Sequence, residues 1–442
     1  MEAEVRPEAA AGEAPRELAT PVAGRAGRAR ALWKNLLLFL AVMGPGIITA
    51  NVDNDAGGIA TYSVAGAQFG NALLWTLIPI TVALVVVQEM SARMGAVTGK
   101  GLADLIRESF GVKIIFWVMV ALIIADLGNT ISEFSGIAAS MEIFSVPKWL
   151  SVPLGAAAVW LLVLRGSYRS VEKVFLVACV FYVAYPISCV LAKPEWGETL
   201  RATVVPSFQG GGAYLATLIG VVGTTIAPWM QFYLQSAVVE KGVKVEQYRH
   251  SRLDVIIGCI ITDVVAFFII VACAATIFKV GLRVETAKDA AIALRPLAGR
   301  YASVLFAFGL LNASIFSAAI LPLATSYYVC EGFGWESGID KKYGEAKQFY
   351  WLYSGIIVIG AGVVLIPKLP LITIMLVSQI ANGVLLPFIL VFMLLLINKK
   401  KLMGDFRNGP VFNWIAWTTT GVMIVLTLWL VGDGVRDLLR PG

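Results

Sequence analysis

A cluster of oxygen-bearing side chains interrupts an apolar stretch near the beginning of the chain. Asn51, Asp53, Asn54 and Asp55 lie close together and are followed by a Gly-Gly pair. Carboxylate and amide oxygens suit hard cations such as Mg²⁺ and Ca²⁺, whereas softer transition metals favour sulfur or nitrogen donors. Asp55 could instead pair with a lysine or cap a half-helix, and capping is an equal alternative for Asp53.

A second apolar stretch is interrupted in a similar way, by Thr224 and Thr225 followed by Ala227 and Pro228. It adds hydroxyl and backbone carbonyl oxygens, but no thioether and no imidazole. The two interruptions together therefore predict an oxygen-only cation site.

Other polar residues lie within apolar stretches and could face the same site. Asp126, Asn129 and Glu133 share one helix face, either as a vestibule or proton path for cations or as groups buried against neighbouring helices. Gln379 and Asn382 could reach the site from the side.

Two further acidic residues have simpler interpretations. We expect Asp263 to be a structural hydrogen-bond partner. Glu89 precedes Arg93 by four residues, which predicts an ion pair along one helix face.

The composition identifies the elements that must position these groups. The 442 residues are 58% hydrophobic and only 14% charged, too few charges to cover a water-soluble protein of this length. We expect an all-α polytopic membrane protein whose partner is the lipid bilayer. The net charge of +6 then reflects basic loops, and no nucleic acid partner is expected.

Metal centres built from soft ligands are excluded by the residue content. The chain has one histidine, His250, and five cysteines without a CxxC pair, so a zinc or haem site lacks ligands. The cysteines are expected to be small packing residues.

Eleven apolar runs are long enough to cross a membrane, at about 20 residues for each span. They lie near residues 35–69, 72–95, 114–143, 147–164, 171–192, 212–239, 254–278, 301–330, 348–366, 370–397 and 412–432. The basic clusters in the loops predict a cytoplasmic N-terminus and an extracellular C-terminus, although the basic loop 279–300 opposes this orientation.

The interrupted runs are the first and the sixth, which is typical of two inverted five-helix repeats. We expect a disordered cytoplasmic tail at 1–32 and a first repeat at 33–195, with its first helix broken near 53–58. The second repeat would span 205–398, broken near 224–230, and helix 11 would follow at 410–434. The substrate site would lie at the membrane midplane, between the two breaks.

Several motifs, in order along the chain, resemble the NRAMP divalent-metal transporters. They are Gly44-Pro45-Gly46, Asp55-Ala56-Gly57-Gly58, Gln88-Glu89-Met90-Ser91-Ala92-Arg93-Met94-Gly95, Thr98-Gly99-Lys100-Gly101-Leu102-Ala103, Tyr233-Leu234-Gln235-Ser236-Ala237, Glu331-Gly332-Phe333, Ser378-Gln379 and Leu386-Pro387-Phe388. The resemblance runs from about residue 36 to residue 405. It implies a LeuT-like fold and the transport of Mn²⁺ or Fe²⁺, usually with protons.

The chain departs from the family pattern at the metal site. The family's Asp-Pro-Gly-Asn resembles Asp55-Ala56-Gly57-Gly58 here, so Gly58 stands where the family has an asparagine ligand. The family's Met-Pro-His-Asn resembles Ala227-Pro228-Trp229-Met230, with an apparent one-residue insertion, so the thioether and the histidine are lost. These losses resemble the NRAMP-related magnesium transporters of bacteria.

The resulting prediction is a secondary transporter of divalent cations in the bacterial plasma (inner) membrane. It would move hydrated Mg²⁺, and also Mn²⁺, into the cytoplasm by alternating access without proton coupling. The expected metal-site residues are Asp55, Asn54, Gly58, Thr224, Ala227, Gln379 and Asn382. The ion is the substrate, and neither a cofactor nor an obligate protein partner is expected.

Three alternatives remain open. The first is a proton-coupled carrier of Mn²⁺ or of trivalent aluminium. The second is an amino-acid transporter of the same fold, which the acidic residues of the first break disfavour. The third is a membrane-embedded enzyme, although the sequence has no HExxH, GxSxG or phosphate-loop motif, so we expect no enzyme activity.

Overall fold

The computed structural model describes residues 44–165, 168–281 and 295–439. These residues belong to one compact unit, residues 42–442, and are helical throughout. The predicted tail at 1–32 lies outside the described residues.

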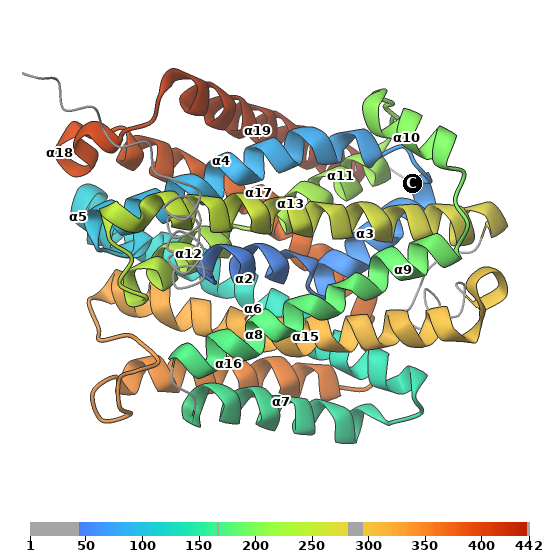
Figure 1. Cartoon of the computed structure of the whole chain (residues 1–442), viewed down its shortest axis with the longest axis horizontal. Helices are drawn as coiled ribbons and strands as arrows, with labels where there is room; N and C mark the ends of the chain where they lie inside the picture. Colours follow the sequence, from blue (N-terminus) through green and yellow to red (C-terminus); the bar gives the residue numbers. More distant parts are fainter. Residues whose placement is uncertain (1–43, 166–167, 282–294, 440–442) are drawn as a thin grey trace, which may run out of the picture. The chain divides into compact units, whose positions relative to one another are not determined.

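The helices of the first half of the chain follow in sequence order (Figure 1). They are α2 Pro45–Asn51, η1 Val52–Asn54, α3 Ala56–Phe69, α4 Leu74–Thr98, α5 Leu102–Phe110, α6 Val112–Ile143, α7 Lys148–Arg165, α8 Tyr168–Val180, η2 Phe181–Val183, α9 Ala184–Leu191 and α10 Trp196–Val204.

The second half begins with another pair of short helices. Its elements are α11 Gly212–Thr225, α12 Pro228–Glu240, η3 Val245–Gln247, α13 Tyr248–Cys273, η4 Ala274–Phe278, α15 Arg295–Phe333, α16 Lys347–Leu365, α17 Leu371–Ile397, α18 Lys400–Met403, η5 Gly404–Phe406 and α19 Pro410–Leu439.

Ten segments of the described chain are long and apolar enough to cross a membrane. The first expected span is not among them because it is divided into α2 and α3, of 7 and 14 residues. The residues before Gly44 that would complete it are outside the described part. The polytopic helical architecture is therefore confirmed, while the count of eleven stays a prediction.

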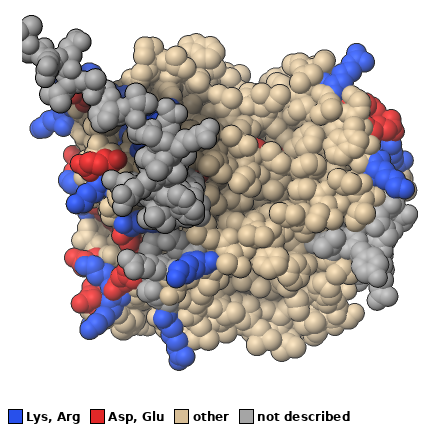
Figure 2. Space-filling view, in the orientation of Figure 1, with Lys and Arg blue, Asp and Glu red and all other residues tan. Residues whose placement is uncertain are grey.

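Charged side chains lie at the two ends of the long helices. Figure 2 shows Lys, Arg, Asp and Glu gathered at these ends, with a broad band of other residues between them. Such a band is the surface that a lipid bilayer would cover. Most of the basic loop 279–300 is outside the described residues, so its side of the membrane is not tested.

The two broken spans pack at the centre of the described helices. α2 and α3 contact α13, while α3 also contacts α6 and α17, and α11 packs along α17 (Figure 1). Glycines permit the closest crossings: a Cβ on Gly46 would lie 2.6 Å from the backbone nitrogen of Val255, and one on Gly223 would lie 2.7 Å from Cα of Gly383. Small residues at such crossings let membrane helices approach closely.

A buried carboxylate fixes the beginning of α2. Asp254 of α13 accepts hydrogen bonds from the backbone nitrogens of Gly44, Gly46 and Ile47 at 3.1, 2.6 and 3.3 Å. These are N–H groups that a helix leaves unpaired at its N-terminus. The contact ties the first half of the broken span to α13.

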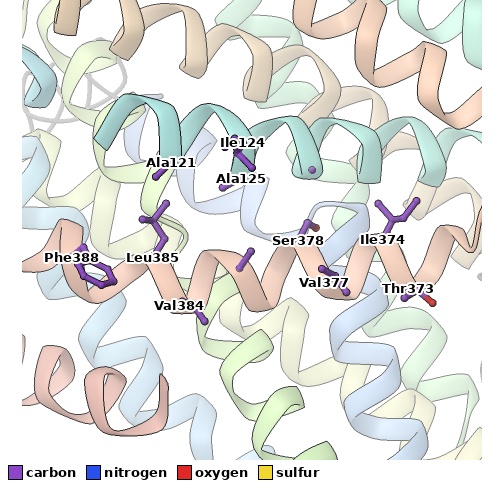
Figure 3. A pocket seen from close by; sticks show the side chains of 12 residues that line it. Ala121, Ile124, Ala125, Thr373, Ile374, Val377, Ser378, Val384, Leu385 and Phe388 are labelled. Atoms are coloured by element: carbon purple, nitrogen blue, oxygen red, sulfur yellow. The ribbon is translucent and has the colours of Figure 1, made fainter. Parts of the chain in front are cut away.

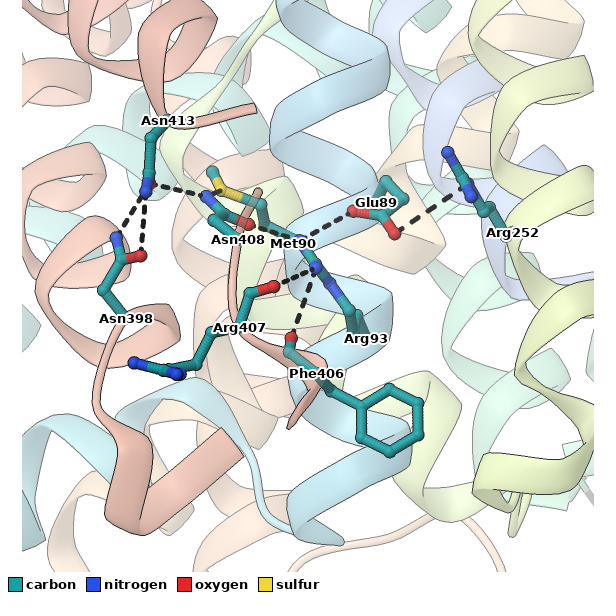
Figure 4. A network of polar contacts seen from close by, with 9 residues as sticks. All are labelled: Glu89, Met90, Arg93, Arg252, Asn398, Phe406, Arg407, Asn408 and Asn413. Carbon is teal, nitrogen blue, oxygen red and sulfur yellow. Dashed lines mark hydrogen bonds and ion pairs between the residues drawn. The ribbon is translucent and has the colours of Figure 1, made fainter. Parts of the chain in front are cut away.

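The expected Glu89–Arg93 ion pair is present in α4 at 3.1 Å, and both residues are buried (Figure 4). Arg93 also donates to the carbonyl oxygens of Phe406 and Arg407 at 3.2 and 3.3 Å, and to the Asn408 side chain. The pair thus holds the segment between α18 and α19 against α4.

Candidate metal-binding site

The first break is centred on Asp55. This residue has an extended backbone, with φ −71° and ψ −178°, and it separates η1 from α3. Its Oδ1 accepts a hydrogen bond from the Gly58 nitrogen at 2.5 Å, which caps α3. The positive end of the α3 dipole therefore supports a carboxylate at this point.

The second break comprises Ile226 and Ala227, between α11 and α12. Pro228 opens α12, where its missing N–H leaves no donor unpaired. The Ala227 carbonyl oxygen accepts from the Met230 nitrogen at 3.2 Å and from Gln231 Nε2 at 3.3 Å. The Ala227 carbonyl is thus engaged within α12.

The two breaks meet at Gly58. A Cβ placed on Gly58 would contact the Asp53 carbonyl oxygen and would lie 2.9 Å from Thr224 Oγ1 and 3.3 Å from Asp55 Oδ1. Thr224 is 2% exposed, and its hydroxyl oxygen has no hydrogen-bond partner within the protein. The hydroxyl of α11 therefore lies beside the carboxylate that begins α3.

The space at Gly58 is filled by the Asp53 carbonyl and by Thr224. The absence of a side chain at this position therefore permits close packing of the two breaks, and it does not enlarge a cavity.

Gln379 of α17 approaches the same helix end from another side. A Cβ on Gly57 would collide with Gln379 Nε2 and would lie 3.1 Å from Ser132 Oγ of α6. Gln379 Nε2 and Ser132 Oγ are buried and have no hydrogen-bond partner within the protein. Both polar groups can therefore turn toward a ligand at the N-terminus of α3.

A second carboxylate lies beside Asp55. Glu133 of α6 accepts a hydrogen bond from the Ala56 nitrogen at 3.1 Å, and it interacts directly with Asp55. Its other oxygen, Oε1, is buried without a partner. Two acidic groups close together in a low-dielectric setting require a positive charge, whether from a proton or from a cation.

A polar chain connects this group to α15. Asn382 Nδ2 donates to Gln379 Oε1 at 3.0 Å and to Asn129 Oδ1 at 3.0 Å. Asn129 Nδ2 in turn donates to Asp126 Oδ1 at 3.1 Å. Asp126 Oδ2 also accepts from Thr325 Oγ1 at 3.0 Å and from the Tyr328 hydroxyl at 2.9 Å. Asn382 therefore positions Gln379, while Asp126 is held by protein donors.

The predicted residues thus divide into three groups. Asp55, Gly58, Thr224 and Gln379 come together at the N-terminus of α3, with Asn382 behind Gln379. Asn54 faces α13, where its Nδ2 donates to Thr262 Oγ1 at 2.6 Å and to the Thr262 carbonyl oxygen at 3.1 Å. Ala227 lies in the second break, and no described contact joins it to Asp55.

Glu133 and Ser132 are the site residues that the predicted set omits. The spacing of Asp126, Asn129 and Glu133 indicated a polar face on α6, but it could not show which member reaches Asp55. In the structure Glu133 reaches the break, while Asp126 faces α15.

The donors gathered here are carboxylate, hydroxyl and amide groups. Among the described residues, no group of three or more His, Cys, Asp or Glu side chains could hold a metal by itself. A cation at this position would therefore combine Asp55 and Glu133 with neutral oxygens and water. Mg²⁺ commonly binds in this way, through one or two carboxylates and several waters.

An apolar groove lies behind this polar group. It has a volume of about 660 Å³ and is lined by α6 and α17, including Ile124, Val377 and Phe388 (Figure 3). These three side chains are more than half exposed. The lining suits contact with lipid, and it offers no cation ligands.

A family model described as natural resistance-associated macrophage protein-like (Nramp) matches residues 46–433. Two relatives are named divalent metal cation transporter MntH. One, from Deinococcus radiodurans, is 29% identical over 410 residues, covering 89% of this chain and 90% of the relative. The other, from Bacillus subtilis strain 168, is 27% identical over 419 residues, covering 91% and 94%.

Solved structures agree on the fold. A manganese transporter of Eremococcus coleocola, in complex with an aromatic bis-isothiourea compound, is similar with a TM-score of 0.74 and 24% identity, covering 93% of this chain and 90% of that one. Mhp1, a nucleobase-cation-symport-1 family transporter, has a TM-score of 0.53 and 14% identity, covering 88% and 93%. The fold is LeuT-like, as the sequence motifs implied.

Proposed function

The chain belongs to the Nramp family, and from that premise we propose that it is a secondary transporter that carries divalent cations across a bacterial inner membrane. The relatives are named as divalent metal transporters, which supports transport and not catalysis. In this proposal Mg²⁺ and Mn²⁺ are substrates that move into the cytoplasm by alternating access.

One observation carries the proposal: Asp55, Glu133, Thr224 and Gln379 converge where the first and sixth spans are broken. Half-helix ends at the centre of a transporter supply the partial charges and free backbone groups that bind ions. Two adjacent carboxylates select cations and disfavour an amino-acid carboxylate.

The preference for Mg²⁺ is inferred from the donor types. The converging side chains supply oxygens and an amide, without a thioether or an imidazole. Soft donors favour transition metals over Mg²⁺, so their absence from this group removes a barrier to Mg²⁺. Mn²⁺ also accepts oxygen ligands and should therefore be carried too.

The proposed lack of proton coupling follows from the position of the only histidine. His250 lies in the first turn of α13, beside the basic residues Arg249 and Arg252, and not in the sixth span. Trp229 and Met230 follow Pro228 in α12, and neither titrates near neutral pH. A potential of 100 mV, negative inside, favours entry of a dication by about 4.6 kcal/mol, twice the value for one charge.

A proton-coupled Mn²⁺ symporter is the second candidate. It is favoured by the names of the relatives and by Glu133, a buried acid beside Asp55 that could take up a proton. The two candidates differ in one observable, which is acidification of the compartment that the metal enters.

The first test replaces the central carboxylate. Asp55→Asn keeps a side chain that can cap α3 but removes the negative charge. We expect uptake of Mg²⁺ and Mn²⁺ into proteoliposomes to fall to the level of empty liposomes, with unchanged thermal stability. Asp405→Asn, which removes an exposed charge, is the control and should retain full uptake. Uptake by Asp55→Asn at the normal rate would place the site elsewhere.

The second test concerns Glu133. Glu133→Gln can still accept the hydrogen bond from the Ala56 nitrogen, but it lowers the negative charge next to Asp55. We expect the KM for Mg²⁺ to rise on the order of tenfold, which corresponds to about 1.4 kcal/mol of binding energy. An unchanged KM, together with loss of a proton flux that the wild type displays, would favour the symporter.

A further inference from the structure

Asp53 and Asp263 are buried aspartates outside the group described above. They are 1% and 5% exposed, and none of their four carboxylate oxygens has a hydrogen-bond partner within the protein. Asp263 was expected to be a structural hydrogen-bond partner, and this expectation is wrong.

Other buried aspartates of the same helices are well satisfied. Asp254, also on α13, accepts three backbone hydrogen bonds at the start of α2. Asp126 on α6 accepts from Asn129, Thr325 and Tyr328. Because an unpartnered buried carboxylate is costly, the contrast indicates that Asp53 and Asp263 have a partner of another kind.

The fold holds the two aspartates together. Asn54 donates to the hydroxyl and the carbonyl oxygens of Thr262, so η1 is fixed against α13 at the residues adjoining Asp53 and Asp263. The two carboxylates repel each other, and both act electrostatically on the Tyr62 hydroxyl of α3. Like charges held close together in a buried place require a compensating cation or proton.

This pair lies on a different side of the first break from Glu133. Asp55 is oriented by Gly58 and interacts with Glu133 of α6, whereas Asp53 faces α13. Packing of α3 between α6 and α13 separates the two pairs (Figure 1). One ion could not serve both while keeping these hydrogen bonds.

Neutral oxygens are available to complete a coordination shell. Asn54 Oδ1 is buried and has no partner within the protein. The Tyr62 hydroxyl, which is hydrogen-bonded to Thr225 Oγ1 at 2.8 Å, also faces the pair. Two carboxylates and neutral oxygens form a hard donor set, and their double negative charge matches one divalent cation.

We propose that Asp53 and Asp263 bind a second divalent cation, which bridges the break of the first span to α13. This site would hold a partly hydrated oxygen-preferring ion of the Mg²⁺ or Mn²⁺ class. Its negative charge would be neutralised by the ion, so the ion would stabilise the contact between η1 and α13.

Counting bound Mn²⁺ tests the proposal independently of transport. The purified full-length protein would be titrated with Mn²⁺ alone, and bound ion measured by electron paramagnetic resonance. We expect two ions for each wild-type chain and for Asp405→Asn, and one for each of Asp53→Asn, Asp263→Asn and Asp55→Asn. A count that is the same in Asp263→Asn, Asp53→Asn and the wild type would overturn the second site.

The same variants separate this proposal from the proposed function. If the wild type binds a single ion that is lost in Asp263→Asn and kept in Asp55→Asn, the second site stands and the Asp55 site fails. Loss in Asp55→Asn alone gives the reverse result.

Thermal stability provides a second readout that does not depend on the count. In chelator, the Asp53→Asn/Asp263→Asn double variant should melt at or above the temperature of the wild type, because one source of repulsion is removed. Adding Mn²⁺ to the Asp55→Asn background should raise the melting temperature only when Asp53 and Asp263 are intact. An equal rise with and without the pair would show that these carboxyls are neutralised by protons instead.

Discussion

At the residue scale, the site consists of oxygen and amide groups whose burial leaves several of them without partners. Thr224 Oγ1, Ser132 Oγ, Glu133 Oε1 and Gln379 Nε2 share this property, and all lie at the N-terminus of α3. Their residue types could be recognised in the sequence, but their orientation could not. Asn54 shows the difference, because its amide turns to Thr262 although its neighbour Asp55 turns to α3.

Ala227→Met tests whether the missing thioether sets ion preference. A sulfur donor added at the second break should favour Mn²⁺, which accepts soft ligands more readily than Mg²⁺ does. We expect the ratio of Mn²⁺ to Mg²⁺ initial uptake rates to rise on the order of tenfold, or about 1.4 kcal/mol. Ala227→Leu adds similar bulk without sulfur and should leave the ratio unchanged. Equal ratios in the Met and Leu variants would exclude sulfur as the determinant.

At the element scale, glycine contacts set how closely the broken spans approach their neighbours. The sequence indicated that the first and sixth spans are interrupted, because polar residues, glycine and proline occur together there. It could not indicate that Gly58 is in contact with the Asp53 carbonyl and Thr224, since Thr224 is distant in sequence. The same holds for Gly46, whose neighbour is the backbone of α13.

Gly46→Ala should destabilise the protein. The added Cβ would lie 2.6 Å from the Val255 nitrogen, so α2 and α13 would have to separate. Overpacking of this kind costs about 1–3 kcal/mol. We expect a lower melting temperature in detergent than for Gly362→Ala on α16, where a Cβ meets nothing within 4 Å. Similar melting temperatures for the two variants would contradict the close α2–α13 crossing.

At the scale of the whole molecule, composition and hydropathy were enough to predict a helical membrane protein, and the motifs were enough to predict its family. Both are confirmed, because low charge and long apolar runs leave few other folds. The pairing of Asp55 with Glu133, and of Asp53 with Asp263, depends on how helices far apart in sequence pack and rotate. The sequence contains no periodic signal for that rotation, so these pairs required the structure.

The account predicts that Mg²⁺ crosses the membrane down its electrochemical gradient without protons. The direct measurement is Mg²⁺ uptake into proteoliposomes that contain a Mg²⁺-sensitive dye, with a pH-sensitive dye in parallel, at several membrane potentials. We expect uptake to accelerate as the interior becomes more negative, while the internal pH stays constant. Failure of Mg²⁺ to enter while Mn²⁺ does, or acidification in proportion to the metal that enters, would contradict it.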